Sequence, residues 1–263
     1  MLRPVHDSAS FVEVRGHRLE YVDIAAQATG RPELLFLHEG LGSVSLWRDF
    51  PQRLASRTGC RTIVYSRAGF GRSSARRQPF TPRFMHEEAL EVIPALRERL
   101  AIEHPVLVGH STGASMALIH AGVDSGPPAG VVAMAPFAFV EDSNLAAIRA
   151  AGERYSQLRD RLARHHDDVD GVFHGWSGTW LAPAFRGWNI DADLERIRCP
   201  VLALLGERDE YSTPAQLERI AAKAVHARGV ETRVLPGCGH SPHRDGPEAL
   251  VVIINRFIET LET

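Results

Sequence analysis

The sequence predicts an α/β protein with a doubly wound, mostly parallel sheet and a small helical lid. Short apolar runs alternate with amphipathic segments over most of the 263 residues, as expected when helices cover both faces of a parallel sheet. The alternation is interrupted between residues 135 and 201, an interval too long for one crossover connection. We therefore predict a core domain of residues 1–136 and 191–263, with residues 137–190 inserted as the lid.

The chain is predicted to open with an antiparallel hairpin, because two alternating stretches, 11–14 and 19–24, flank the turn Arg15-Gly16-His17. Six apolar runs then resemble strands buried on both faces, at 34–37, 62–65, 106–108, 131–135, 201–205 and 232–235. Amphipathic segments between and after them are predicted to be helices, at 46–56, 84–100, 111–121, 214–226 and 247–261. In the lid, 145–163 is predicted to be one helix, and a weakly patterned, aromatic-rich stretch follows it.

Composition gives no reason to expect a nucleic acid or membrane partner. The formal net charge at pH 7 is −2, so no electrostatic argument favours either polyanion or membrane surface. The three cysteines, Cys60, Cys199 and Cys238, are odd in number and lack metal-ligand spacing, which favours a reduced, cytoplasmic setting. Residues 1–7 lack the apolar core of a signal peptide, and no apolar stretch reaches membrane-spanning length. We expect a small-molecule substrate, no cofactor and no metal; the oligomeric state stays open.

Residues 109–113 read Gly-His-Ser-Thr-Gly and stand between the apolar run 105–108 and a helix-like stretch. A G-x-S-x-G sequence in this context forms a sharp turn with a strained central residue, and the flanking glycines leave room for it. The turn exposes the serine Oγ and directs the N–H groups of the helix N-terminus at any oxyanion formed there. Ser111 is therefore a candidate nucleophile. A glycine-rich turn without catalysis is the alternative.

A serine nucleophile needs a neighbouring base and a third group that orients this base. In open parallel sheets such groups are expected just after the carboxyl ends of the strands. His240, in a glycine-flanked loop after the last predicted strand, is the candidate base, with His243 as the alternative. Asp209, after the preceding strand, is the candidate orienting acid, with Glu207 as its rival. The other histidines of the lid and helices are expected to be solvated or capping residues; these include His120, His165, His166 and His174.

The chain order Ser111, Asp209, His240, with these strand contexts, resembles the α/β-hydrolase family over essentially the whole chain. Residues 37–43, Leu-His-Glu-Gly-Leu-Gly-Ser, resemble the loop that carries the oxyanion hole in this family. Residues 65–73, Tyr-Ser-Arg-Ala-Gly-Phe-Gly-Arg-Ser, look like the family's Asp-x-x-Gly-x-Gly-x-Ser turn. The resemblance implies an α/β-hydrolase fold and a serine hydrolase with a Ser-Asp-His triad.

Two positions depart from the family pattern. Ser66 stands where the family commonly has aspartate, and we expect it to change only the hydrogen bonds of the turn. Glu39 stands where glycine commonly follows the histidine, and it either makes a structural hydrogen bond or touches the substrate. By resemblance, the backbone N–H of Thr112 and one from Gly40 or Leu41 form the oxyanion hole.

Within the family, a serine nucleophile argues against dehalogenase and epoxide hydrolase activities, which use a carboxylate. We expect hydrolysis of an ester-like bond in a small apolar or aromatic carboxylic substrate through an acyl-enzyme. Two alternatives stay open: hydrolysis of a carbon–carbon bond in ring-cleavage products, and a small-molecule receptor that keeps the triad. The candidate pocket residues are Glu39, Phe137, Trp176, Trp180 and Trp188, because binding pockets are mostly apolar with a few polar groups.

Overall fold

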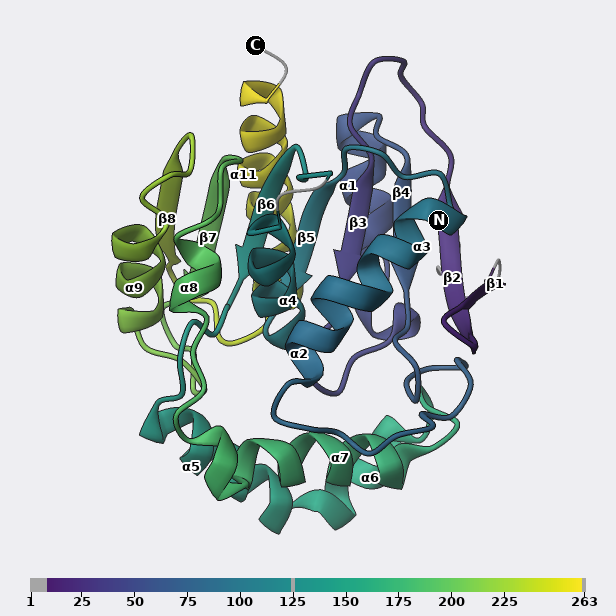
Figure 1. Cartoon of the computed structure of the whole chain (residues 1–263), viewed down its shortest axis with the longest axis vertical. Coiled ribbons are helices and arrows are strands. Elements are labelled where there is room, and N and C mark those ends of the chain that lie inside the picture. Colours follow the sequence, from purple (N-terminus) through teal and green to yellow (C-terminus); the bar gives the residue numbers. More distant parts are fainter. Residues whose placement is uncertain (1–8, 124–125, 262–263) are drawn as a thin grey trace.

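The computed structural model describes residues 9–123 and 126–261. Residues 1–7, for which the sequence predicts no signal peptide, lie outside the described residues. Within the described residues the strands form one eight-stranded sheet in the order β1-β2-β4-β3-β5-β6-β7-β8 (Figure 1). The strands are β1 (Ser10–Val14), β2 (His17–Ile24), β3 (Leu34–Leu37), β4 (Thr62–Tyr65), β5 (Val106–His110), β6 (Gly130–Met134), β7 (Val201–Gly206) and β8 (Val230–Leu235). The predicted α/β class is confirmed.

The sheet is antiparallel at one edge and parallel elsewhere. The hairpin β1–β2 is antiparallel, as predicted, and β2 pairs antiparallel with β4. The other neighbouring strands are parallel. The prediction that 232–235 is buried on both faces is wrong, because β8 is the last strand of the sheet and its residues 231–234 are exposed.

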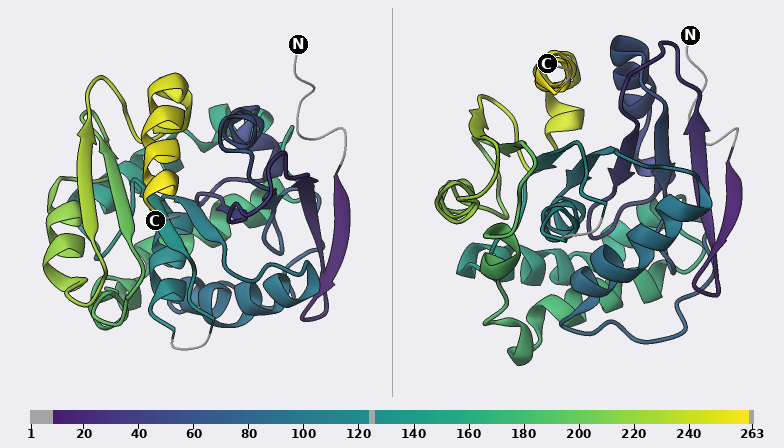
Figure 2. Two further views of the ribbon diagram at one scale, coloured as in Figure 1. Left: turned by 90° about the horizontal axis from the view of Figure 1, so that it is seen from above. Right: turned by 45° about the horizontal axis from the view of Figure 1, so that its top comes forward.

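Helices cover both faces of the sheet (Figure 2). On one face, α1 (Phe50–Thr58) and α11 (Pro247–Thr260) pack side by side, burying Leu54 and Ile254 against the strands. The other face carries α2 (Phe84–Glu87), α3 (Ile93–Arg99), α4 (Thr112–Ala121), α8 (Asp191–Leu194) and α9 (Ala215–Lys223). Every residue of α4 is buried, so the helix that follows Ser111 is fixed on all sides.

The predicted helix 84–100 contains a π-helical turn at Glu88–Val92, between α2 and α3. Pro94, which follows this turn, has no N–H to donate to the carbonyl of Leu90, and its ring would collide with that carbonyl in a regular helix. The wider π turn avoids this collision. No helix in the described residues is long and apolar enough to cross a membrane.

Three helices lie beyond the carboxyl ends of the parallel strands (Figure 1). They are α5 (Asp142–Glu153), α6 (Tyr155–Leu162) and α7 (Val169–Leu181), and we call them the helical layer. The predicted single helix 145–163 is wrong, because the chain leaves helical geometry at Arg154 (φ −102°, ψ 13°). The weakly patterned stretch after it forms α7, which buries Phe173, Trp176 and Trp180.

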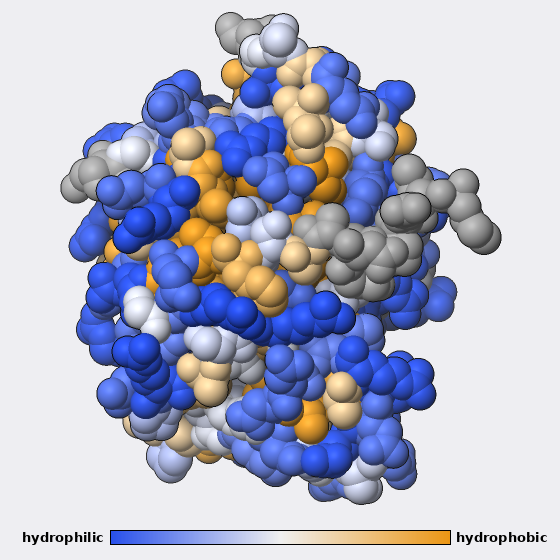
Figure 3. Space-filling model, turned by 90° about the vertical axis from the view of Figure 1, so that its right-hand side faces the viewer, coloured by the Kyte–Doolittle hydropathy of each residue, from blue (hydrophilic) through white to orange (hydrophobic). Residues whose placement is uncertain are grey.

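The side of the molecule that carries β1 is mostly hydrophilic, with apolar residues gathered in its upper half (Figure 3). Phe11 of β1 is 40% exposed, and the guanidinium carbon of Arg18 lies 3.9 Å above the centre of its ring. A charged side chain over an apolar edge residue also hinders pairing of this edge with another strand.

The turn after β4 holds the loop at residues 43–47 in place. Glu20 of β2 is buried, and its Oε2 accepts hydrogen bonds from Ser66 Oγ (2.8 Å) and from the Arg72 N–H (3.0 Å). Ser66 Oγ in turn accepts a hydrogen bond from the Val44 N–H (2.9 Å). A carboxylate is thus present at this turn. It comes from Glu20 of β2, and residue 66 is a serine that donates to it.

Replacing Glu20 by alanine should destabilise the fold, because it leaves the buried Ser66 hydroxyl and the partly buried Arg72 N–H without their acceptor. We expect the free energy of unfolding to fall by about 1–3 kcal/mol for each unpaired donor, measured by urea denaturation. The double variant Glu20→Ala, Ser66→Asp restores a carboxylate at the turn and should recover part of the loss. Glu13→Ala, at an exposed position of β1, is the control; equal losses for Glu13 and Glu20 would contradict the assignment.

Candidate active site

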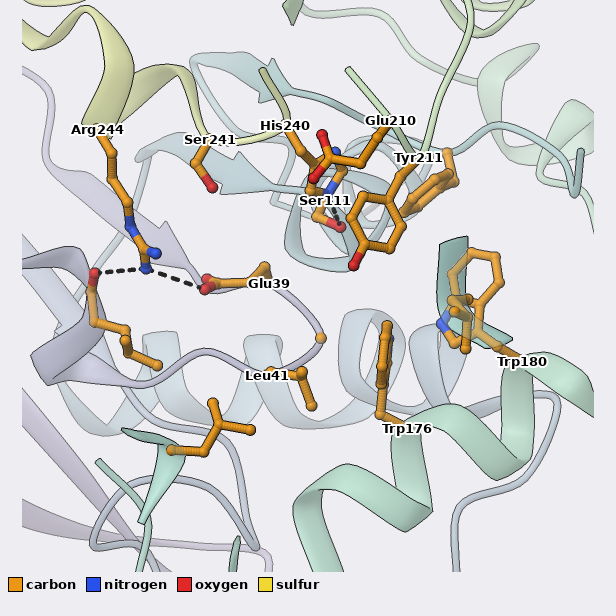
Figure 4. Close-up of a pocket in the computed structure, with 15 residues that line it drawn as sticks. Glu39, Leu41, Ser111, Trp176, Trp180, Glu210, Tyr211, His240, Ser241 and Arg244 are labelled. Atoms are coloured by element: carbon orange, nitrogen blue, oxygen red, sulfur yellow. Dashed lines mark hydrogen bonds and ion pairs between the residues drawn. The ribbon is translucent and has the colours of Figure 1, made fainter. Parts of the chain in front are cut away.

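Ser111 occupies a strained turn between β5 and α4 (Figure 4). Its backbone has φ 55° and ψ −122°, a conformation that non-glycine residues rarely adopt. A Cβ on Gly109 or on Gly113 would overlap neighbouring backbone atoms, so both positions require glycine. The Ser111 N–H donates to the carbonyl of Met134 on β6 (2.8 Å), which fixes the turn to the sheet. Ser111 is 5% exposed, and its side chain lines a cavity.

The structure brings Ser111, His240 and Asp209 together in one chain of hydrogen bonds. Ser111 Oγ lies 3.0 Å from His240 Nε2, and His240 Nδ1 lies 2.9 Å from both carboxylate oxygens of Asp209. The side chain of Asp209 is fully buried, and its Oδ1 also accepts the N–H groups of Tyr211 (2.8 Å) and Ser212 (3.1 Å). With Nδ1–H donated to Asp209, the Nε2 of His240 is free to accept the serine proton.

The rival residues are placed elsewhere. Glu207 Oε2 accepts the N–H of Gly237 (2.9 Å) and makes no contact with the His240 ring in the described residues. His243 is buried between Trp47 and Phe50, and its ring centre lies 4.8 Å from that of His110. Burial lowers the pKa of His243 well below its ordinary value. Asp209 and His240 are therefore the residues that the geometry pairs with Ser111.

In the loop after β3, the carbonyls of His38 and Glu39 are bound by side chains, whereas the N–H groups of Gly40 and Leu41 are not bound in the part of the chain that the structure describes. Arg67, which is buried, donates to the carbonyls of His38 (2.5 Å) and Glu39 (2.8 Å). His38 Nδ1 also donates to the Glu39 carbonyl (2.8 Å). Within the described residues, the N–H groups of Gly40, Leu41 and Thr112 make no hydrogen bond. These are the three predicted oxyanion donors, and each is available to a ligand.

The cavity at Ser111 measures about 260 Å³ and has an apolar and a polar part. Trp176 and Trp180 extend from α7 toward Ser111, and Arg244, Ser241 and Glu39 lie on its other side (Figure 4). The residues that line the cavity are Glu39, Gly40, Leu41, Leu46, Ser111, Phe137, Ile148, Leu162, Trp176, Trp180, Glu210, Tyr211, His240, Ser241 and Arg244.

Trp188 is not brought to this cavity. Its ring instead stacks on Phe185, with 5.3 Å between ring centres and 12° between planes. Sequence reasoning missed Tyr211, Ser241 and Arg244, although each stands within four residues of Asp209 or His240 and could have been found by that proximity. Leu46, Ile148 and Leu162 carry no comparable signal, because they reach the cavity only through the packing of distant elements.

Glu39 lies between two basic side chains at the polar end of the cavity. Its Oε2 is 3.5 Å from His110 Nδ1, and its Oε1 is 3.6 Å from Arg244 Nη2. His110 also donates from Nε2 to the carbonyl of His240 (2.6 Å) and so holds the backbone of the candidate base. Glu39 is therefore linked to His240 through His110. Burial raises the pKa of Glu39, but His110 and Arg244 outweigh it, and the pKa lies well below 4.5.

Two histidines expected to be solvated are buried. His120 of α4 lies 1% exposed between Arg97 and the Ala89 carbonyl, and burial lowers its pKa to about 4. His166, between α6 and α7, is 5% exposed and bonds to two loops of the core. The expectation was wrong because burial at these positions depends on distant segments that local pattern does not reveal.

A sequence model of the alpha/beta hydrolase family matches residues 34–252. The chain therefore belongs to this family. Over 105 residues it is 30% identical to proline iminopeptidase of Lactobacillus delbrueckii subsp. lactis, a match that covers 40% of this chain. The matched part spans only 36% of that relative's length.

Solved structures with the same fold include a peptidase and an esterase. Proline iminopeptidase of Mycobacterium smegmatis superposes with a TM-score of 0.75 at 20% identity, covering 97% of this chain and 99% of that one. Carboxylesterase CesB of Bacillus subtilis gives a TM-score of 0.68 at 19% identity, with coverage of 98% and 92%. At this identity the likeness shows the fold alone.

The depressed pKa of Glu39 gives a pH-dependent contribution to stability. A carboxylate whose pKa is lower in the folded than in the unfolded chain stabilises the fold above its unfolded pKa of about 4.5, and this effect is lost as pH falls through the folded pKa. Glu39→Gln should therefore lower Tm at neutral pH, and the difference from wild type should shrink as pH falls below about 4.5.

Thermal unfolding followed by circular dichroism across this pH range measures the effect. Glu98→Gln, at an exposed position of α3, is the control and should show no such trend. A Tm difference for Glu39→Gln that stays constant with pH would contradict a role for the carboxylate charge.

Proposed function

We propose that this chain is a serine hydrolase that cleaves the ester bond of a small carboxylic ester through an acyl-enzyme. The observation that carries the proposal is the hydrogen-bonded series Ser111, His240 and Asp209 opening on a partly apolar cavity. The cavity volume of about 260 Å³ is just below the usual range for ligand pockets, about 300–1,000 Å³, which favours a small substrate.

In the proposed reaction, Ser111 Oγ attacks the ester carbonyl carbon while His240 Nε2 takes the hydroxyl proton. The carbonyl oxygen becomes an oxyanion, which accepts hydrogen bonds from Thr112 N–H and from Gly40 or Leu41 N–H. His240 then gives its proton to the leaving alcohol oxygen, and the acyl group stays on Ser111. Water, deprotonated by His240, attacks the acyl carbon. His240 then returns this proton to Ser111 Oγ as the bond between Oγ and the acyl carbon breaks, which releases the carboxylic acid and the free serine.

Asp209 stabilises the charge that His240 carries during both steps. It stays ionised, and its bond to Nδ1–H keeps Nε2 directed at Ser111. The rings of Tyr211 and Phe137 flank the imidazole, with centres 4.6 Å and 6.0 Å from it, and limit its rotation. We further propose that residues 137–190, which include the helical layer, act as the lid that selects the substrate.

The test of this function compares Ser111→Ala, Asp209→Asn and wild type on a panel of p-nitrophenyl esters. Loss of the nucleophile should lower turnover by about 10⁶-fold, and Asp209→Asn by about 10⁴-fold, because the imidazole would be held in the wrong tautomer. Labelling by a fluorophosphonate, which reacts with activated serines, should vanish in Ser111→Ala. Activity of Ser111→Ala within tenfold of wild type would remove Ser111 from the mechanism.

Glu207→Gln is the matched control for the acid and should keep wild-type turnover. If Glu207→Gln were the damaging change and Asp209→Asn were mild, the assignment of the acid would be wrong. A wild-type chain that binds an ester but turns over only once would instead favour a receptor, and cleavage of a β-diketone without ester hydrolysis would favour carbon–carbon bond hydrolysis.

The helical layer should determine which esters are cleaved. We call residues 37–43, which include the proposed donors Gly40 and Leu41, the oxyanion loop. Trp176 lies against this loop, since a Cβ on Gly40 would overlap the indole of Trp176. Trp176→Ala should therefore change the kcat/KM ratio between a short and a bulky aromatic ester by about 1–3 kcal/mol, the scale for lost apolar pocket contacts. Trp188→Ala, outside the cavity, should lower Tm without changing this ratio.

Parallel measurements of Tm and of kcat/KM on the two esters distinguish these roles. Trp180→Ala should both lower Tm and change the kcat/KM ratio, because the buried ring of Trp180 packs on Phe137 and Phe185 and also lines the cavity. An unchanged kcat/KM ratio in Trp176→Ala and Trp180→Ala would contradict the proposal that these residues form the substrate pocket. Substrate choice would then be assigned to the loops at Glu39 and Phe137.

A further inference from the structure

The segment between α6 and α7 carries a histidine that joins two loops of the core. His166 Nε2 donates to the Leu41 carbonyl (2.9 Å), and His166 Nδ1 accepts the Gly71 N–H (3.0 Å). Because a carbonyl only accepts and an N–H only donates, the ring must be neutral with its proton on Nε2. Burial lowers the pKa of His166, which agrees with a neutral ring.

The residues on either side of His166 strengthen the same connection. The Asp167 N–H donates to the Gly71 carbonyl (3.0 Å), so both polar groups of Gly71 are bound by this segment. His165 Nδ1 lies 2.8 Å from Ser45 Oγ, just beyond the oxyanion loop. The chain between α6 and α7 is therefore held to the core by hydrogen bonds of its side chains and backbone. The core residues that it contacts lie 95 or more positions earlier in the sequence.

Leu41 is the point at which this connection reaches the proposed oxyanion hole. The carbonyls of His38 and Glu39 are bound by Arg67, but within the described residues the Leu41 carbonyl accepts a hydrogen bond from His166 alone. Rotation of the peptide after Leu41 changes the backbone angles of Leu41, whose own N–H is a proposed oxyanion donor. His166 thus restrains the part of the loop that Arg67 does not hold.

We propose that His166 is a positioning residue, which ties the helical layer to the oxyanion loop and thereby aims the N–H groups of this loop at the reacting carbonyl. This inference rests on the proposed function. Since the same segment leads into α7, which carries Trp176 and Trp180, His166 links the placement of the substrate pocket to the alignment of the oxyanion donors.

The test replaces His166 by leucine, which removes both hydrogen bonds, and by glutamine, whose amide offers one donor and one acceptor. His166→Leu should lower kcat about 10- to 100-fold with KM nearly unchanged, less than the 10²–10³-fold cost of deleting an oxyanion donor, because the N–H groups remain but are misaligned. It should weaken inhibition by phenylboronic acid, whose serine adduct mimics the oxyanion, by a similar factor. His166→Gln should recover most of both losses.

The control is His174→Leu, at an exposed position of α7, which should leave kcat, KM and boronate inhibition at wild-type values. Circular dichroism at the assay temperature verifies that each variant is folded. If His166→Leu does not fold, His166→Asn, whose shorter amide can reach only one of the two loops, takes its place. A lower Tm with unchanged kcat and boronate inhibition would overturn the proposal, because His166 would then only stabilise the fold.

Hydrogen–deuterium exchange gives a readout that is independent of catalysis. Amides at residues 40–45 should exchange faster in His166→Leu than in wild type and in His174→Leu. Unchanged exchange would contradict the claim that His166 restrains the oxyanion loop. A wild-type chain without esterase activity would overturn the proposed function, and with it the positioning role, while the exchange data would still decide whether His166 holds the loop.

Discussion

The strained backbone of Ser111 is the constraint on which the rest of the site depends. A positive φ at a non-glycine residue persists only when the surroundings enforce it. Here the Ser111 N–H is bound to β6, and the helix that follows is buried along its whole length. The close approach of Gly113 to the carbonyl of Leu37 then places the start of α4 beside the oxyanion loop. The candidate nucleophile and the unbound N–H groups are thus neighbours because of backbone packing.

Much of the fold could be predicted from sequence because the central strands are continuous apolar runs, and β3 and β4 begin and end where these runs do. The strand at β8 was also predicted, but its exposure was not, because it follows from the position of β8 as the last strand of the sheet. The break at Arg154 and the helix α7 were missed for a related reason: in the helical layer, packing against the core decides the conformation, and local periodicity is weak.

The candidate site divides in the same way. Ser111, Asp209 and His240 follow strands, where topology brings residues to one edge of the sheet, so their meeting could be expected from sequence. Trp188 could not be told from Trp176 by sequence, since both are aromatic residues of the same stretch. In the structure Trp176 belongs to α7, whereas Trp188 follows the end of that helix and the short turn at 183–185. His166 stands in a run of polar residues, Arg164-His165-His166-Asp167, which is typical of an exposed loop, and only the tertiary structure shows that it is buried.

The loop that carries His240, the candidate base, follows β8. The hydrogen bond from His110 to the carbonyl of His240 gives this loop a second attachment to the core. His110, which precedes the candidate nucleophile, holds the loop of the candidate base directly, in addition to the attachment of this loop to β8. That strand has a neighbour on one side only and is largely exposed. Substitution of the exposed side chains at 231–234 should therefore leave this hydrogen bond in place.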